Sequence, residues 1–324
     1  MFIDNGAGVC YNYFRCSDGV GIGEDLLSYN AITPILKGSR PFSMENLGYY
    51  NGRYDLLENM TVPMNDRACY FGDGIFEVAY CRNYKIYALD EHMDRMYESA
   101  DILGIDIPHT KEELSDIIRS LVLKLDSHEQ LVYWQVSRGT QLRNHAPEKG
   151  LKANVWVTLR PMKLKDIYTP MSLISLEDTR FFHCNMKTLN LIPTVMASAK
   201  AEAAGADEAV FHRNGRVTEC AHSNISIIQS DGSIKTAPAD NLILAGVARA
   251  HLIKMCERFG IAVHEEPYTI EELMAADEVI VTSSGTLCRP VSTVDGVPVG
   301  GKAPELLKKL QDALMKDFME KTEK

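Results

Sequence analysis

The Asn-Gly dipeptides at 51–52 and 214–215 constrain the fold of this chain more than any other feature of its 324 residues. Asn51-Gly52 interrupts an extended run in the first half, and Asn214-Gly215 separates two strand-like segments, 208–212 and 216–219, in the second. Asn-Gly readily adopts the positive φ angles that a two-residue hairpin turn requires. The sequence therefore predicts an antiparallel hairpin in each half of the chain.

Helices are predicted between the strands, so that both halves mix the two kinds of element. Asp90 can cap a helix that runs to about Leu103, because apolar residues recur there at helical spacing. Residues 75–89 are predicted as a further hairpin that turns at Arg82-Asn83. The other predicted helices span about 111–125, 188–204, 246–259 and 306–318, and the other predicted strands span 131–138, 153–160, 171–176, 224–228 and 279–282. These elements indicate an α+β fold.

The length suggests one large domain or two of ordinary size. Pro161 and Pro170 disfavour regular structure between the two halves. We expect an N-terminal extension over 1–45, a small α+β domain over 46–160, a linker over 161–166 and a larger domain over 167–324.

Composition narrows the classes of partner. The net charge of −10 at pH 7 argues against nucleic acid or an anionic membrane as the main partner. No apolar run approaches the ~18 residues that a membrane span needs. The eight cysteines are scattered without a CxxC pair, which predicts neither a zinc site nor a disulfide scaffold, and no other metal is expected. The first residues lack a basic stretch followed by an apolar one, so we expect a cytoplasmic protein.

Lys187 and Glu219 are candidate reactive groups. Lys187 lies in CNMKTLNLIP, and a lysine buried in partly apolar surroundings has a lowered pKa and a nucleophilic amine suited to a Schiff base. Glu219 ends a predicted strand 32 residues later, where an acidic group could keep a pyridine nitrogen protonated. Taken singly, such residues are more often a solvated lysine and a turn carboxylate, so their context has to support the assignment.

Other segments offer groups that bind anions. Residues 246–248 open a helix and residues 281–286, VTSSGT, form a small hydroxyl-rich loop, and exposed amides at such places bind phosphate. Arg95 lies on the polar side of its helix. A loop further along offers two cations that can hold a carboxylate, Arg143 and His145.

Together these segments resemble the class IV, or fold-type IV, pyridoxal-phosphate aminotransferases from about Met44 to the C-terminus. The resemblance implies a two-domain α+β protein with pyridoxal 5′-phosphate in the cleft between its domains. The stretches that carry it are RACYFGDGIFE (67–77), LDEHMDRMYESA (89–100), KTLNLIPTVMASAKAEAAGADEAVFHRNGRVTECAHSNI (187–225), LILAGVAR (242–249) and DEVIVTSSGTLCRPV (277–291).

The resemblance also implies a role for each matching residue. Lys187 matches the lysine that binds the cofactor covalently and catalyses the reaction, and Glu219 matches the partner of the pyridine nitrogen. The implied phosphate contacts are Arg95, Ser284 and the backbone amides of Val247 and Ala248, with Arg180 as a further basic residue near the phosphate.

Within the family, Arg143-Asn144-His145 is similar to the Arg-x-His carboxylate trap of the D-amino-acid aminotransferases. The resemblance then implies a homodimer that transfers an amino group between D-alanine or a related D-amino acid and a 2-oxo acid such as 2-oxoglutarate.

Three residues depart from the pattern of the D-specific enzymes. Phe76, at the substrate site, stands where those enzymes usually carry a tyrosine. Ala248, among the phosphate contacts, replaces a usual threonine, and Leu287 stands where a glutamate is common. A branched-chain L-amino-acid aminotransferase and an aminodeoxychorismate lyase therefore stay open as alternatives. A non-catalytic binding protein is the alternative outside the enzymes.

Overall fold

The computed structural model describes residues 46–323, so the predicted extension over residues 1–45 lies outside the described residues. The sheets are built from 47–161 and from 171–298, with an irregular connection between them. This mixture of helices and two sheets confirms the predicted α+β fold. The division of the chain at 160 and at 167 stays a prediction.

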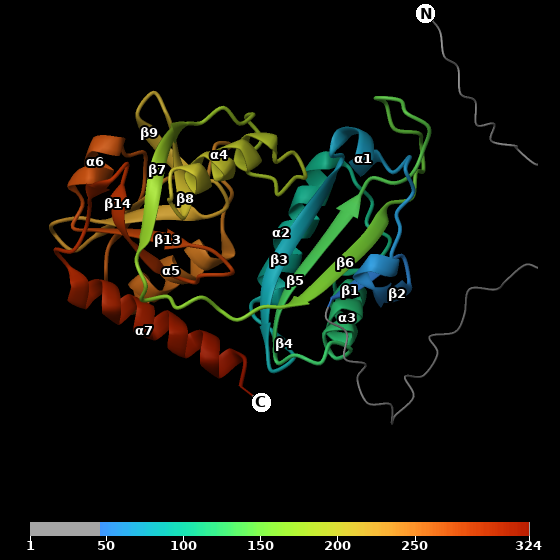
Figure 1. Ribbon diagram of the computed structural model, residues 1–324, viewed down its shortest axis with the longest axis horizontal. Helices are drawn as coiled ribbons and strands as arrows, with labels where there is room; N and C mark the ends of the chain where they lie inside the picture. The colour runs from blue at the N-terminus through green and yellow to red at the C-terminus, as the bar shows by residue number, and fades with distance from the viewer. Residues whose placement is uncertain (1–45, 324) are drawn as a thin grey trace, which may run out of the picture. The chain divides into compact units, whose positions relative to one another are not determined.

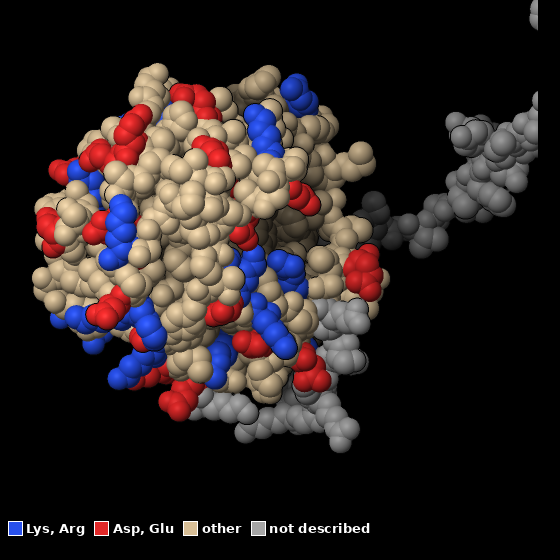
Figure 2. Space-filling view, turned by 60° about the vertical axis from the view of Figure 1, so that its left-hand side comes forward, with Lys and Arg blue, Asp and Glu red and all other residues tan. Residues whose placement is uncertain are grey.

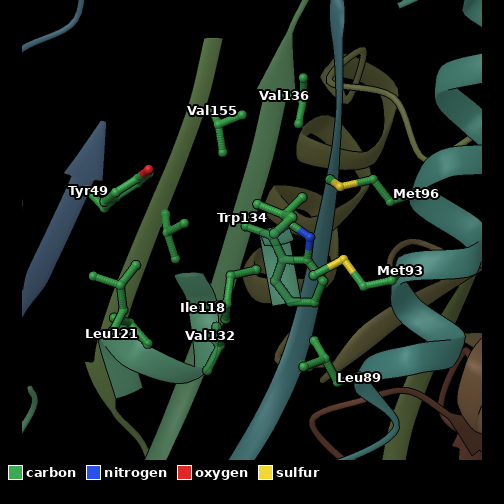
Figure 3. Packing of buried hydrophobic residues seen from close by; sticks show 14 of the residues in the cluster. Tyr49, Leu89, Met93, Met96, Ile118, Leu121, Val132, Trp134, Val136 and Val155 are labelled. Atoms are coloured by element: carbon green, nitrogen blue, oxygen red, sulfur yellow. The ribbon is translucent and has the colours of Figure 1, made fainter. Parts of the chain in front are cut away.

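The first sheet has six strands among the described residues, all in antiparallel pairs, in the order β2-β1-β6-β5-β3-β4. Helices α2 and α3 lie against it (Figure 1). Trp134 is fully buried at their interface, and Figure 3 shows Met93 and Met96 of α2 beside it. The bounds are β1 Leu47–Tyr50, β2 Arg53–Leu56, α1 Arg67–Phe71, β3 Gly74–Arg82, β4 Lys85–Ile86, α2 Leu89–Leu103, α3 Lys111–Val122, β5 Glu129–Ser137 and β6 Asn154–Pro161, with a 3-10 turn at Leu57–Asn59.

The second sheet has nine strands among the described residues and mixes parallel and antiparallel pairs, in the order β12-β11-β10-β13-β14-β7-β8-β9, with β15 beside β14. Apolar residues of α5 and α7 share one core with strands β10, β11 and β13. The bounds are β7 Met171–Glu177, α4 Ile192–Ala203, β8 Glu208–Arg213, β9 Arg216–Cys220, β10 Asn224–Ile228, β11 Ile234–Thr236, α5 Val247–Arg258, β12 Val263–Glu265, α6 Ile270–Ala275, β13 Glu278–Thr282, β14 Arg289–Val294, β15 Val297–Pro298 and α7 Pro304–Lys321.

The predicted hairpins are confirmed, with one shift of register. Asn51 and Gly52 turn between β1 and β2, and Asn214 and Gly215 turn between β8 and β9. The turn between β3 and β4 lies at Asn83-Tyr84, one residue later than predicted, with φ angles of 51° and 63°. Asparagine tolerates this left-handed region, and here it takes the first of the two turn positions.

Two predicted helix starts are wrong. Helix α2 begins at Leu89 with no side-chain cap. Asp90 lies inside its first turn, where a negative charge stabilises the helix through its dipole. Helix α4 begins at Ile192 instead of Thr188. Thr188 instead forms a β-bridge with Ile75, so this segment is held in an extended form.

Helix α3 ends at Val122, three residues before its predicted end. Helix α5 and strand β10 lie as predicted. Several short elements lack a prediction: α1, β11, β12, α6, β14 and β15.

Charges and thiols are distributed without forming a metal site in the described part of the chain. Figure 2 shows acidic and basic side chains interspersed on one face, with Lys and Arg gathered below a hollow. Between residues 46 and 323, no group of three or more His, Cys, Asp or Glu side chains could hold a metal ion, and six cysteines are free. No helix of this part is long and apolar enough to cross a membrane.

Candidate active site

A pocket of about 490 Å³ brings together most of the predicted site residues. Its wall includes residues of both sheets and the segments that lead into α4 and α5. The predicted residues that line it are Phe76, Arg95, Arg180, Lys187, Glu219, Val247, Ala248 and Ser284. The two predicted carboxylate-binding residues, Arg143 and His145, are not among the described residues that line it.

Lys187 is held in place by strand β3. Its carbonyl accepts a hydrogen bond from Phe76 N at 3.0 Å, and its Nζ lies 4.3 Å from the centre of the Phe76 ring. Burial, with a smaller contribution from the nearby Arg95, lowers the pKa of Lys187 to about 8. The amine is therefore more easily deprotonated than that of an ordinary lysine, as a nucleophile requires.

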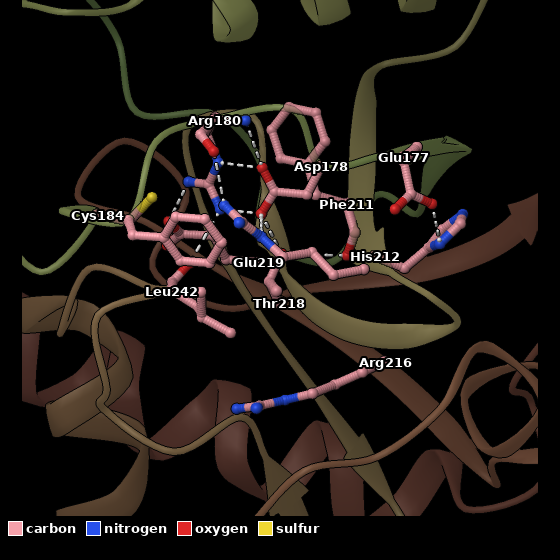
Figure 4. A network of polar contacts seen from close by, with 12 residues as sticks. Glu177, Asp178, Arg180, Cys184, Phe211, His212, Arg216, Thr218, Glu219 and Leu242 are labelled. Atoms are coloured by element: carbon pink, nitrogen blue, oxygen red, sulfur yellow. Dashed lines mark hydrogen bonds and ion pairs between the residues drawn. The ribbon is translucent and has the colours of Figure 1, made fainter.

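Glu219 is a buried carboxylate at the end of β9. It accepts hydrogen bonds from Arg180, from Asn224 Nδ2 at 3.0 Å and from Leu244 N at 3.2 Å. Burial raises its pKa to about 6, although Arg180 acts in the opposite direction. The structure thus places Arg180 against this carboxylate (Figure 4). The implied place of Arg180 near a phosphate stays a prediction.

Arg95 is oriented by Glu77, whose side chain is fully buried on β3. Arg95 donates from Nε and Nη2 to the two carboxylate oxygens at 2.8 and 2.7 Å, and from Nη1 to Ala245 O at 3.0 Å. These donors, with the Coulombic attraction of Arg95, outweigh burial and hold the pKa of Glu77 at about 2. Arg95 therefore brings a fixed positive charge to the pocket wall beside the start of α5.

His92 completes this cluster as a neutral ring, because burial lowers its pKa. Its Nδ1 lies 2.7 Å from Glu77 Oε2 and its Nε2 lies 3.4 Å from Ser284 Oγ. Since an ionised carboxylate only accepts, Nδ1 carries the proton and Nε2 accepts from the serine hydroxyl. The loop that holds Ser284 is thereby connected to the Arg95 cluster.

The start of α5 adds backbone donors to the same wall. No side chain caps this helix, whose N-cap is Gly246, so the amides of its first turn are available to an anion. A Cβ at Gly246 would lie 1.9 Å from Asn224 Oδ1, and Asn224 also donates to Leu244 O at 2.8 Å. The absence of a side chain at Gly246 lets the helix start pack against the residue that holds Glu219.

The loop with Arg143 and His145 is held elsewhere. Arg67 donates to Asn144 O at 2.6 Å and to His145 O at 2.9 Å. The Arg143 guanidinium and the His145 ring both lie 5.2 Å from the centre of the Phe71 ring. The two side chains share one side of the loop, but they contact α1 instead of lining this pocket.

Glu77, Asn224 and Asp178 are site residues that the sequence analysis missed. Glu77 carried a usable signal, because it is a carboxylate among the buried apolar positions 75, 79 and 81 of one strand face. Asn224 and Asp178 carried none: Asp178 lies two residues from Arg180 and Asn224 lies five residues from Glu219, but neither spacing by itself identifies a site residue.

Comparison with known proteins identifies the family. The model of the class IV aminotransferases matches residues 74–294. The chain belongs to this family. It is 38% identical over 269 residues to a D-alanine aminotransferase of Listeria monocytogenes, covering 81% of this chain and 93% of that protein. It is 36% identical over 278 residues to a D-alanine aminotransferase of Bacillus licheniformis, covering 85% and 98%.

Solved structures of class IV aminotransferases have the same fold. A branched-chain aminotransferase of Thermoproteus uzoniensis solved with norvaline superposes with a TM-score of 0.78 at 25% identity, covering 86% of this chain and 96% of that one. Another branched-chain amino acid aminotransferase, solved with N-(5′-phosphopyridoxyl)-L-glutamate, gives 0.74 at 26%, covering 83% and 94%. A putative 4-amino-4-deoxychorismate lyase of Legionella pneumophila gives 0.74 at 26%, covering 80% and 97%. The chain is thus an aminotransferase whose family implies pyridoxal phosphate.

The Glu77 cluster predicts a pH-dependent stability. A carboxyl whose pKa falls from 4.5 to about 2 on folding contributes stability above pH 4.5, which is lost as the pH falls toward 2. Between pH 5.5 and 4, the wild type should therefore lose roughly 1 kcal/mol more of its free energy of unfolding than Glu77→Gln does. At pH 7, Glu77→Gln should be less stable by about 3–5 kcal/mol, because Arg95 loses its partner. Urea denaturation measures both.

The control is Glu98→Gln, which removes an exposed carboxylate from the same helix as Arg95. Equal pH slopes for the wild type and Glu77→Gln would contradict the ionised, arginine-bound state of Glu77.

The close approach at Gly246 predicts that Gly246→Ala is destabilising. The new Cβ would displace Asn224 from Glu219 and from Leu244 O, which should cost about 1–3 kcal/mol. Gly285→Ala is the matched control, since a Cβ there meets only Met162 at 3.9 Å. Thermal denaturation that finds both variants equally stable would show that the packing around Gly246 yields without cost.

Proposed function

We propose that this aminotransferase moves an amino group between D-alanine or a related D-amino acid and a 2-oxo acid such as 2-oxoglutarate, using pyridoxal 5′-phosphate. The observation that carries the proposal is one pocket in which an amine with a pKa of about 8 shares a wall with a buried carboxylate and with an arginine beside a helix start. The preference for D-amino acids rests on the relatives named D-alanine aminotransferases and on the Arg143-x-His145 sequence.

The pocket residues fit the groups of pyridoxal phosphate. Glu219, with its pKa raised to about 6, is suited to meet a ring nitrogen, and Lys187 to bind an aldehyde carbon. The uncapped amides of Val247 and Ala248, with Arg95 and Ser284, are suited to a phosphate. When bound, the cofactor supplies an aldehyde that takes the amino group and a ring that accepts electron density from the substrate Cα.

The chain itself supplies the proton transfers. With a pKa of about 8, about one tenth of the Lys187 amines are uncharged at pH 7, against far fewer for an ordinary lysine. We propose that the free amine first acts as a base and takes the proton from the substrate Cα. It then acts as an acid and donates a proton to the carbon of the cofactor aldehyde group. The Glu219 carboxyl group stays beside the ring nitrogen during both proton transfers and keeps that nitrogen protonated.

Recognition of the substrate carboxylate is proposed to come from a second subunit. A carboxylate that enters a pocket needs a charged partner, and the Phe76 ring offers no hydrogen bond. We propose a homodimer in which Arg143 and His145 of one subunit serve the pocket of the other.

We also propose a cytoplasmic location, with which the six free cysteines of the described residues are compatible.

A branched-chain L-amino-acid aminotransferase is the second candidate, because Phe76 is similar to the residue of those enzymes. An amino-donor screen with D-alanine and L-leucine, each with 2-oxoglutarate, distinguishes the two. Release of pyruvate from aminodeoxychorismate without any 2-oxo acid would instead indicate a lyase. Transfer from D-alanine and not from L-leucine is the expected result.

Lys187→Ala tests the catalytic assignment. The variant loses the only group proposed for both covalent binding and proton transfer, so turnover should fall to background and the characteristic absorbance of bound cofactor should vanish. Lys200→Ala, at the end of helix α4, is the control. Transamination by Lys187→Ala at the wild-type rate would refute the assignment.

Arg143→Ala tests the carboxylate site. Loss of a charge-assisted hydrogen bond should lower kcat/KM for D-alanine about 10- to 150-fold, with the cofactor absorbance unchanged. An equal loss for D- and L-donors, or no loss, would place the carboxylate elsewhere.

The same variant tests the proposed subunit exchange. In a mixed dimer, the Arg143→Ala subunit carries an intact Lys187, and the Lys187→Ala subunit carries an intact Arg143 loop. If the loop serves the partner, the site with the intact Lys187 regains activity and the mixture exceeds both parents. A mixture that stays at the mean of its parents would show that each loop serves its own subunit.

A further inference from the structure

Behind the pocket, four side chains form a row of alternating charge. The row runs from Arg213 through Asp178 and Arg180 to Glu219. Figure 4 shows Asp178, Arg180 and Glu219. Glu219 and Arg180 line the pocket, whereas Asp178 and Arg213 do not. Asp178 therefore cannot contact a ligand in the pocket directly. It can influence such a ligand only through Arg180.

Asp178 is more completely hydrogen-bonded than a simple ion pair would require. Its side chain is 0% exposed and lies just past the end of β7. Oδ1 accepts from Arg180 N and Nε, both at 3.0 Å, and Oδ2 accepts from Arg180 Nη2 at 2.9 Å. Oδ2 also accepts from Thr218 Oγ1 at 3.0 Å and Arg213 Nε at 3.2 Å. Both edges of the carboxylate are thus occupied.

This arrangement fixes the direction of the Arg180 guanidinium. Nε and Nη2 are committed to Asp178, so Nη1 is the nitrogen left to face Glu219. Leu242 O accepts from Nη2 at 3.1 Å, and the Phe211 ring lies 4.9 Å from the guanidinium carbon, which limits rotation. Without Asp178, the same guanidinium could turn and offer Glu219 two nitrogens or none.

We propose that Asp178 is a positioning residue, which holds Arg180 so that one donor meets Glu219 and the carboxylate stays directed into the pocket. The inference rests on the proposed function only for the assignment of Glu219 to the cofactor ring.

Arg213, at the other end of the row from Glu219, also holds the backbone of Arg180 in place. It donates to Arg180 O at 2.8 Å, and its guanidinium carbon lies 4.5 Å from the Phe182 ring centre.

Asp178→Asn tests the proposal, because asparagine keeps the shape and one acceptor but turns an amide toward Arg180 and Arg213. Pyridoxal phosphate should bind the apoenzyme about 10- to 100-fold more weakly. The half-reaction with D-alanine should lose a similar factor in its maximal rate, with KM within about twofold, since Asp178 lies outside the substrate pocket. The control is Glu177→Gln, the preceding residue, whose carboxylate pairs instead with His212 at 3.2 Å.

The double variant Asp178→Asn/Glu219→Gln separates positioning from general destabilisation. If Asp178 acts through Glu219, the double variant binds pyridoxal phosphate no more than two- to threefold more weakly than Glu219→Gln alone. Effects that multiply, or an Asp178→Asn variant that binds like the wild type, would overturn the proposal.

If Asp178→Asn does not fold, Asp178→Asn/Arg213→Gln removes the cation left unpaired and is used in its place, with the same expected loss. A wild type that binds pyridoxal phosphate but transfers no amino group from any donor would contradict the proposed function. The binding measurements would still decide the role of Asp178.

Discussion

The pocket depends on the pairing of strand β3 with the segment that precedes α4. Phe76 N donates to Lys187 O at 3.0 Å and Leu189 N donates to Gly74 O at 3.1 Å, with the Ile75–Thr188 bridge between them. Strand β3 belongs to the first sheet, so these bonds attach a segment of the second half of the chain to it. The attachment needs a glycine, because a Cβ at Gly74 would lie 2.7 Å from Val136 O and 2.8 Å from Leu189 Cδ1.

Two buried carboxylates in this region show how partner geometry sets charge. Glu77 receives two nitrogens of Arg95 and the ring of His92, and its pKa is about 2. Glu219 receives one nitrogen of Arg180, because Asp178 takes the others, and its pKa is about 6. Burial raises the pKa of both carboxylates and the paired arginine lowers it in both, and His92 lowers the pKa of Glu77 further. One carboxylate is a permanent anion, and the other can exchange a proton near neutral pH.

The sequence predicted what local patterns determine. Asn-Gly turns, the strands beside them and the Gly246 helix start follow from residues close together in the chain, and the structure has them. The start of α4 was wrong because the helical pattern after Lys187 is overridden by pairing with β3, about 110 residues earlier. Eight of the predicted site residues line one pocket, because a family resemblance already contains the tertiary fold, and their roles stay predictions. Asp178 and Asn224 bond to Arg180 and Glu219, which are close to them in the sequence, but no local pattern marks these pairs. Their further partners Arg213, Thr218 and Leu244 are brought near only by folding.

The three departures from the D-specific pattern have places in this structure that preserve the charges of the pocket. Phe76 stacks on Tyr133 with ring centres 5.5 Å apart, so the wall beneath the Lys187 amine is aromatic. Ala248 lies in the first turn of α5, where the backbone amide that an anion needs is retained without the side chain. Leu287 is 4% exposed and packs in an apolar cluster with Tyr80, Ile167 and Phe318. A glutamate at position 287 would bury an unpaired charge against α7, so the leucine belongs with the packing of this helix and not with the chemistry of the pocket.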